Sequence, residues 1–370
     1  MSNANSDFKI IENAPRPVIT TGIIGWMRDN LFSSPLNIGL TAIGVYLIYL
    51  LLPPLLDWAI FNANFVGEGQ EACSGTGACW IFIRTRMSLF MYGFYPGDEY
   101  WRINIVFLLL AATFLPQFFS AFPYKKAFGI FSVTGLPIVA FILISGDMFG
   151  LAHVETEQWG GLSLTLLLAF VGIVAALPFG IILALGRRSN MPVIRTMCIV
   201  FIELWRGVPL ISVLFMASVM LPLFLPEGVT FNKLLRALIG IVMFQSAYMA
   251  EVIRGGLQAI PKGQYEAAEA LGLNYWKSMG LIILPQALKL VIPGIVNTFI
   301  ALFKDTTLVL IIGLFDILGS VQSAIVDPAW RGVSTEGYIF AAFCFWIFCF
   351  GMSRYSQALE RKLHTGHKRN

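Results

Sequence analysis

Between two long apolar runs the chain reads Gly263-Gln264-Tyr265-Glu266-Ala267-Ala268-Glu269-Ala270-Leu271-Gly272, and it continues to Leu284-Pro285. This stretch is polar and rich in helix formers, so it predicts a short helix held at one membrane face by the apolar segments around it. Ala268 and Gly272 are four residues apart, which places them on one face of that helix and lets another backbone come close. Pro261 and Pro285 are expected to limit the length of the helix.

The composition assigns the chain to the membrane proteins. Of its 370 residues 57% are hydrophobic and 12% are charged, whereas about 25% of the residues of a typical soluble domain are charged. Three His and five Cys leave little material for a metal site, and no metal site is predicted. We therefore expect an all-α polytopic membrane protein.

Eight apolar runs are close to the roughly 20 residues that one helical crossing needs. A polar segment, residues 1–35, precedes them and contains an expected interfacial helix over 22–34. The predicted spans are 36–56, 103–122, 128–145, 162–185, 205–225, 234–253, 288–312 and 338–352.

The distribution of basic residues gives an orientation. With the N-terminus in the cytoplasm, 17 Lys and Arg fall in cytoplasmic segments and five fall outside. Because Lys and Arg gather on cytoplasmic loops, both termini are expected there, including the basic tail 356–370. The stretch around Glu266 then also faces the cytoplasm.

The expected outer loop, residues 57–102, contains two cysteines in a run rich in Gly, Ala and Ser. Cys73 and Cys79 are six residues apart, and in an oxidising compartment they can close a small loop. The alternative is a pair of free thiols in a flexible hairpin.

The chemistry of the chain is defined mainly by motifs that its sequence lacks. A phosphate loop needs Gly-Lys-Ser/Thr, but Lys277-Ser278 follows Trp276, so no nucleotide cradle is expected. The sequence also lacks Gly-x-Ser-x-Gly, His-Glu-x-x-His and Cys-x-x-Cys. No catalytic residue is predicted, and no cofactor of its own is expected.

An ordinary amphipathic connector would satisfy the composition of the stretch around Glu266, but its spacing points to a family. Glu-Ala-Ala, a Gly after three further residues and a later Leu-Pro resemble the EAA motif of permease subunits of ABC importers. Further segments resemble the polar amino acid branch of these permeases: 159–166, 187–189, 201–210 and 304–308.

The resemblance covers about residues 158–355, which implies a five-helix type I importer core with its coupling loop at 254–287. The segment 36–157 would add three helices. Together with the polar N-terminal segment, this arrangement is similar to the long permeases for general or acidic and amide L-amino acids, such as glutamate, glutamine, aspartate and asparagine.

The family implies a division of labour among several subunits in the bacterial inner membrane. A periplasmic binding protein delivers the amino acid, two permease subunits form the path, and two ATPase subunits bind ATP and Mg²⁺. A different second permease is expected rather than a second copy; membrane lipid is a further partner, and nucleic acid is not. The resemblance makes the stretch from Tyr265 a coupling helix, carried by Tyr265, Glu266, Ala267, Ala268, Gly272 and Pro285.

Intramembrane polar residues form a second candidate site. Asn297 and Lys304 are seven residues apart and share a helical face, and Asp305 and Thr306 follow them. Since charges at membrane depth usually face a protein interior or cavity, these residues predict a substrate path or gate. The alternative is that Lys304 and Asp305 lie near a span end, where Thr306 satisfies freed backbone groups.

Glu203 and Arg206 are three residues apart, so they can pair on one helix face. We expect an anchoring ion pair at the interface rather than a ligand contact. An ion-coupled secondary amino acid transporter remains the alternative function, although it predicts an internal repeat that this sequence does not show clearly. A membrane enzyme would need clustered catalytic residues.

Overall fold

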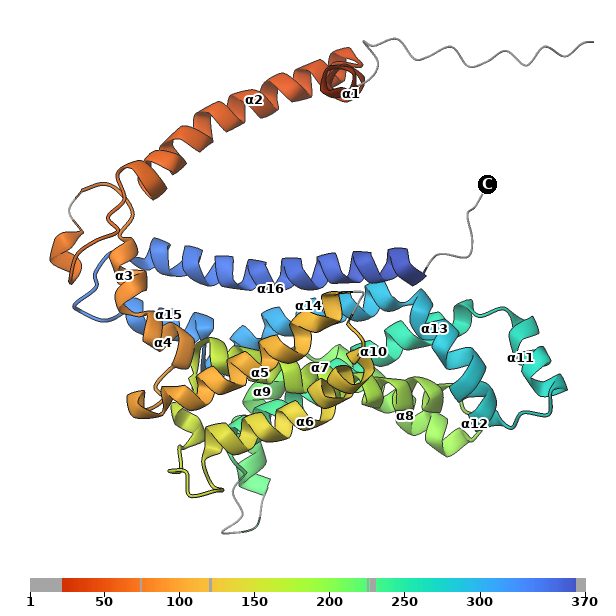
Figure 1. Ribbon diagram of the computed structural model, residues 1–370. Helices are drawn as coiled ribbons and strands as arrows, with labels where there is room; N and C mark the ends of the chain where they lie inside the picture. Colours follow the sequence, from red (N-terminus) through yellow and green to blue (C-terminus); the bar gives the residue numbers. More distant parts are fainter. Residues whose placement is uncertain (1–21, 74, 120–121, 225, 227–230, 364–370) are drawn as a thin grey trace, which may run out of the picture. The chain divides into compact units, whose positions relative to one another are not determined.

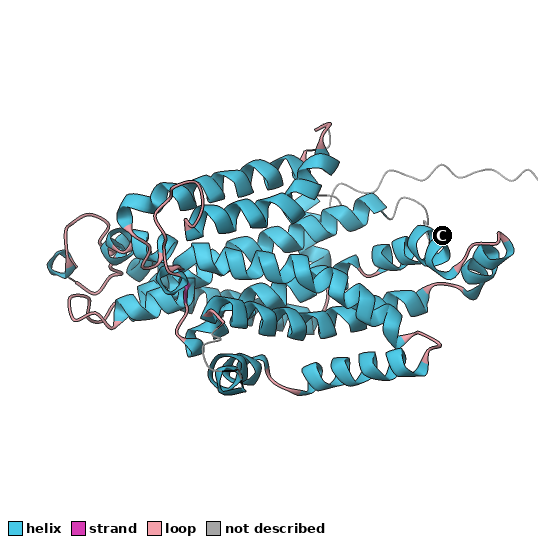
Figure 2. Ribbon diagram, turned by 90° about the horizontal axis from the view of Figure 1, so that it is seen from below, coloured by secondary structure: helices cyan, strands magenta, loops and turns pink. Residues whose placement is uncertain are grey.

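The computed structural model describes residues 22–73, 75–119, 122–224, 226 and 231–363. The chain forms two compact units, Met1–Phe65 with Cys73–Cys79, and Val66–Ala72 with Trp80–Asn370. Figures 1 and 2 show that helices make up nearly all of the described chain. Parts of the predicted N-terminal segment and of the basic tail, residues 1–21 and 364–370, lie outside the described residues.

The first unit contains α1 (Gly22–Asn30), α2 (Pro35–Leu56) and a π-helical turn η2 (Asp57–Phe61). Ser34 starts α2: its hydroxyl accepts the Asn37 N–H at 3.2 Å, and Pro35 stands at the first helical position, where a missing N–H costs nothing. No residue of α2 is buried within the protein. An apolar helix of 22 residues with no buried side is expected to face lipid.

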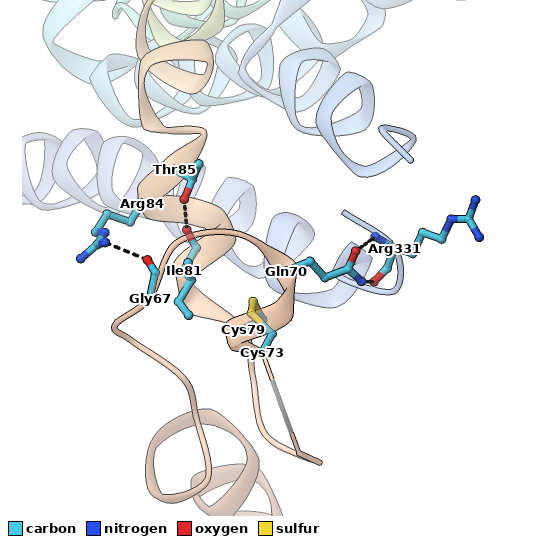
Figure 3. Close-up of a disulfide and its surroundings, with 8 residues drawn as sticks. All are labelled: Gly67, Gln70, Cys73, Cys79, Ile81, Arg84, Thr85 and Arg331. Carbon is cyan, nitrogen blue, oxygen red and sulfur yellow. Dashed lines mark hydrogen bonds between the residues drawn. A yellow bond between two sulfur atoms is a disulfide. The ribbon is translucent and has the colours of Figure 1, made fainter. Parts of the chain in front are cut away.

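Cys73 and Cys79 are joined by a disulfide, so the structure contains the first of the two arrangements that the sequence left open (Figure 3). The loop that they close is anchored in the first unit by two backbone hydrogen bonds. Asn64 N–H donates to Ala78 O, and Ala78 N–H donates to Trp58 O, both at 2.8 Å.

The second unit begins with short elements: η3 (Gln70–Ala72), α3 (Trp80–Thr85), α4 (Met87–Tyr92) and η4 (Gly97–Glu99). Gln70 fixes η3 to a distant loop, because its side-chain amide donates to Arg331 O and accepts from Arg331 N–H (Figure 3). Phe82 and Phe90 pack edge to face, with ring centroids 5.8 Å apart. These short helices therefore form a packed layer rather than an open loop.

Two added spans follow, α5 (Tyr100–Phe118) and α6 (Lys125–Ser145), which pack against each other. The buried Arg102 fixes their common end: its guanidinium pairs with Glu99 at 2.8 Å and donates to Ala152 O at 2.7 Å. Phe114 of α5 packs edge to face on Phe170 of the following core helix, α7 (Gly161–Arg187), with ring centroids 5.9 Å apart. These contacts hold the added spans against the remaining helices.

Four further spans belong to this unit: α7 (Gly161–Arg187), α10 (Lys233–Ala259), α14 (Ile292–Asp305) continued by the 3₁₀ turn η9 (Thr306–Ile312), and α16 (Ser334–Leu363). Figure 1 shows α7 and α10 at the centre of this unit, where they form its largest helix–helix contact. Small buried residues of α7, such as Gly172 and Ala176, let the backbones approach.

A bent helix pair covers the span predicted over 205–225 and extends it back to Pro192. Helix α8 (Pro192–Gly207) ends before Pro209, and α9 (Leu210–Phe215) continues through η6 (Met216–Met220) and η7 (Leu221–Phe224) at an angle of 102°. The break lies before Pro209 because proline disfavours the helical conformation of the residue it follows, and Val208 is extended. With this pair counted as one span, the described residues contain the predicted eight.

Candidate coupling and transport sites

The stretch quoted above folds into a helical hairpin rather than one helix. Helix α11 (Lys262–Ala270) is followed by a turn and by α12 (Tyr275–Ser278), η8 (Met279–Ile283) and α13 (Leu284–Leu290). Figure 1 shows α11 and α12 at the far end of the connection between α10 and α13. We refer to residues 262–278 as the α11 tip.

Gly272 lies in the turn and not in a helix, which corrects its predicted place on one face with Ala268. Its φ is +71°, and two hydrogen bonds close α11 around it: Gly272 N–H to Glu269 O at 2.9 Å and Leu273 N–H to Ala268 O at 3.2 Å. This is a Schellman cap, which needs a left-handed residue. Ala268 is fully buried within the chain, so it cannot offer its face to a partner.

The prediction that Pro285 stops the helix is also wrong. The helical backbone runs from α12 through η8 into α13, and Pro285 stands near the start of α13. The π-helical turn Met279–Ile283 comes directly before it. A wider turn relieves the clash between a proline ring and the preceding turn, so the helix continues.

The outer surface of the α11 tip is apolar as well as charged. Leu271 and Trp276 are 74% and 72% exposed, and Glu266 and Ala267 are exposed beside them. Large exposed apolar side chains on a polar loop mark a contact surface more often than a free one. The tip is therefore a candidate docking surface.

Tyr265 attaches the α11 tip to the helix bundle. Its hydroxyl donates to Leu257 O of α10 at 3.0 Å and accepts from Arg188, directly after α7, at 3.1 Å. The Arg188 guanidinium also lies 5.6 Å from the centre of the tyrosine ring. Tyr265 thus links α11 to the ends of α7 and α10.

Next to this attachment, five charged residues from three helices form a charge cluster. Glu251 of α10 is at its centre, and Arg187, Arg206 and Arg254 contact it at 2.8, 3.7 and 2.8 Å. Arg187 also binds Glu203 of α8 at 2.9 Å. Glu251 is only 16% exposed, so its charge depends on these partners.

The predicted pairing of Glu203 with Arg206 is not the one that the structure contains. Glu203 pairs with Arg187, while Arg206 contacts Glu251 and lies 5.6 Å from the ring centre of Tyr248. Glu251 and Arg254 were missed by the sequence analysis, although two opposite charges three residues apart at the end of an apolar run are a usable signal.

The second candidate site lies where α14 changes into η9. The α-helix ends at Asp305, and the hydroxyls of Thr306 and Thr307 donate to Phe303 O and Lys304 O at 2.8 and 2.9 Å. Asn297 and Lys304 are exposed, Asp305 is half-buried and Thr306 is buried. The structure therefore contains the helix break that the alternative prediction described, with Thr306 bonded to a freed backbone group. A role of these four residues in a substrate path remains a prediction.

This break packs against the break in the neighbouring span, because η9 contacts α9. Leu210 and Leu214 of α9 lie in the same buried cluster as Val309 and Ile312 of η9. The buried Arg236 of α10 donates to Ser218 O in η6, which supplies a partner for a π-helical carbonyl. Irregular backbone at membrane depth occurs only inside protein or beside a cavity, so these turns are the natural place for a path.

At the opposite end from the α11 tip, glycines let three segments meet. Gly160 and Gly161 bridge to Phe315 and Asp316 of the short strand β1 (Phe315–Asp316). A Cβ on Gly160 would lie 2.8 Å from Phe315 O, so only glycine fits. Asp316 starts α15 (Ile317–Ile325) by accepting the Gly319 N–H at 2.9 Å. Burial raises the pKa of Asp316 to about 6.

Comparison with known proteins identifies the family of this chain. A family model described as "Binding-protein-dependent transport system inner membrane component" matches residues 176–365. The inner membrane amino-acid ABC transporter permease protein YhdY of Escherichia coli K12 is 57% identical, over 96% of this chain and 98% of its own length. The chain belongs to the amino-acid ABC transporter permeases.

A second relative agrees with this family. The glutamate/glutamine/aspartate/asparagine transport system permease protein BztC of Rhodobacter capsulatus is 43% identical over 96% of both chains. A crystal structure of an amino acid ABC transporter with histidines matches at 30% identity, over 55% of this chain and 92% of that one, with a TM-score of 0.49. The permease is thus an inner-membrane transport subunit, and the family model begins inside α7, after the added spans α5 and α6.

Proposed function

We propose that this permease is one membrane-spanning half of an importer that moves polar L-amino acids from the periplasm to the cytoplasm. Glutamate, glutamine, aspartate and asparagine are the expected substrates, and the name of BztC supports this class. The observation that carries the proposal is the α11 tip, whose exposed Leu271 and Trp276 are tied to α7 and α10 through Tyr265.

The proposal assigns energy supply to other subunits. An ATPase binds ATP and Mg²⁺, docks on the α11 tip and moves it, and two such subunits serve a pair of permeases. The excess of Lys and Arg on one side supports cytoplasmic termini and a cytoplasmic α11 tip. A periplasmic binding protein delivers the substrate to the other face, and the second permease is a different chain.

Within the permease, the proposed path runs beside the two breaks at α9 and η9. A zwitterionic substrate needs partners of both signs, which Lys304 and Asp305 provide next to the polar Asn297 and Thr306. Charges at membrane depth face a protein interior or cavity. In the complete importer, this surface of α14 would face the path.

Uptake of labelled glutamate by intact cells tests the source of energy. We expect uptake to stop when ATP is depleted and to continue when an uncoupler removes the proton gradient while ATP is maintained. Unlabelled glutamine, aspartate and asparagine should compete, and leucine should not. A carrier driven by protons or sodium ions would give the opposite energy dependence and would overturn the proposal.

A further inference from the structure

A cavity of about 310 Å³ lies between the added helices α5 and α6 and the core helices α7 and α10. It is about twice the size of the ~150 Å³ apolar cavity that holds one benzene molecule. Each helix contributes apolar side chains at helical spacing, for example Ile103, Phe107 and Leu110 of α5. The cavity is separate from the α11 tip and from the breaks at α9 and η9.

Polar groups gather at one end of this cavity. They are the side chains of Asp147, His153, Thr156 and Asn232, which lie beyond α6 and before α7 and α10. His153 Nδ1 lies 2.6 Å from an Asp147 oxygen, and the Asn232 amide lies 2.6 Å from the Thr156 hydroxyl. The site is therefore a hydrocarbon-lined slot with a mouth that can donate and accept hydrogen bonds.

One side of the slot is open to the surface of the protein. Phe141 and Leu235 line it and are nevertheless 54% and 44% exposed, whereas Ile103 and Leu136 line it and are almost fully buried. Since all four helices are membrane spans, the open side faces the hydrocarbon of the bilayer. A lipid chain can enter sideways without crossing water.

The dimensions and chemistry select one kind of occupant. From Ile103 to Leu110 the slot follows seven residues, about 10 Å of helix at 1.5 Å per residue, within a leaflet about 15 Å thick. Apart from Ser145 and Ser163 at the ends of α6 and α7 near the mouth, its helix walls are apolar, so a zwitterion lying along them would pay for lost hydration. An unfilled slot would also lose dispersion contacts along its walls. We propose that it binds one acyl chain of a membrane phospholipid, with the headgroup at the polar mouth.

Photolabelling of the full-length protein tests this site. The protein is reconstituted into bilayers that contain phosphatidylethanolamine with a photoreactive acyl chain, and labelled peptides are mapped by mass spectrometry. We expect label on the buried lining residues Leu136 and Ile103, which an annular lipid cannot reach. Label confined to outward residues such as Ile138, 62% exposed, would overturn the proposal.

Filled variants provide the control. Ala140→Trp places a large side chain in the slot and should lower labelling of Leu136 at least tenfold, while Ala112→Trp on the exposed side of α5 should change it less than twofold. Leu238→Trp fills the slot from α10, and it replaces Ala140→Trp if that variant does not fold. Undiminished labelling of Leu136 in folded, filled variants would contradict acyl-chain binding, as would displacement of the probe by an isoprenoid quinone but not by unlabelled phosphatidylethanolamine.

Discussion

Gly272 ends α11 because its backbone adopts a conformation that costs an L-residue with a side chain roughly 1–2 kcal/mol. Nothing in the chain lies within 4 Å of the position where its Cβ would be, so the constraint is conformational and not steric. The spacing from Ala268 predicts close approach on a helix face at this residue, whereas the structure places it in the turn after α11. Gly272 after the Ala-rich run is itself a helix C-cap signal, which the prediction from sequence did not use.

The Schellman cap allows a test that separates two roles of Gly272, namely the left-handed turn and close approach of a partner. Gly272→Val should lower uptake at least tenfold, because a β-branched residue disfavours the left-handed turn. Gly272→Asn tolerates this turn and should retain at least half of the uptake. Membrane insertion of each variant is the control, and loss of uptake in an inserted Gly272→Asn variant would show that a partner approaches this position closely.

At the scale of elements, the charge cluster joins the α11 tip to the broken span. Arg187 and Arg188 are neighbours at the end of α7; the first binds Glu203 and Glu251, and the second binds Tyr265. Glu203 and Arg206 lie near the C-terminal end of α8, directly before the break that precedes α9, so the cluster links α11 to that break. The partners Arg187 and Glu251 are 64 residues apart, so only the packing of α7 on α10 brings them together. Spacing within one helix could suggest only local pairs, such as Glu203 with Arg206 or Glu251 with Arg254.

Loss of the Glu251 carboxylate should uncouple the α11 tip from the broken span formed by α8 and α9. Glu251→Gln keeps the shape of the side chain but leaves three arginines facing Glu203 alone, and each lost charged hydrogen bond costs about 1.5–3 kcal/mol. We expect a lower melting temperature and at least threefold more ATP hydrolysed per amino acid imported by the purified complex. Glu157→Gln breaks the distant pair with Lys233 and is the matched control. A ratio equal to that of the unmodified complex in a folded Glu251→Gln variant would remove the cluster from the mechanism.

At the scale of the whole molecule, most spans could be predicted because the bilayer sets the length of an apolar helix. The run 234–253 lies inside α10, and 128–145 lies inside α6. The angle of 102° between α8 and α9 could not be predicted in this way, since apolar composition does not report the direction of a helix. The lipid slot could not be predicted from the sequence either, because its lining comes from four helices and forms only when they pack.

The central claim is that an ATPase binds the α11 tip and that its movement of the tip powers import. The most direct measurement is substrate-stimulated ATP hydrolysis by the complete importer in proteoliposomes, with Leu271→Glu compared with Leu271→Met. The exposed Leu271 should contribute apolar contact, so a buried, unpaired carboxylate should reduce the stimulation at least tenfold, and methionine should preserve it. Full stimulation and uptake by the Leu271→Glu complex would contradict the account.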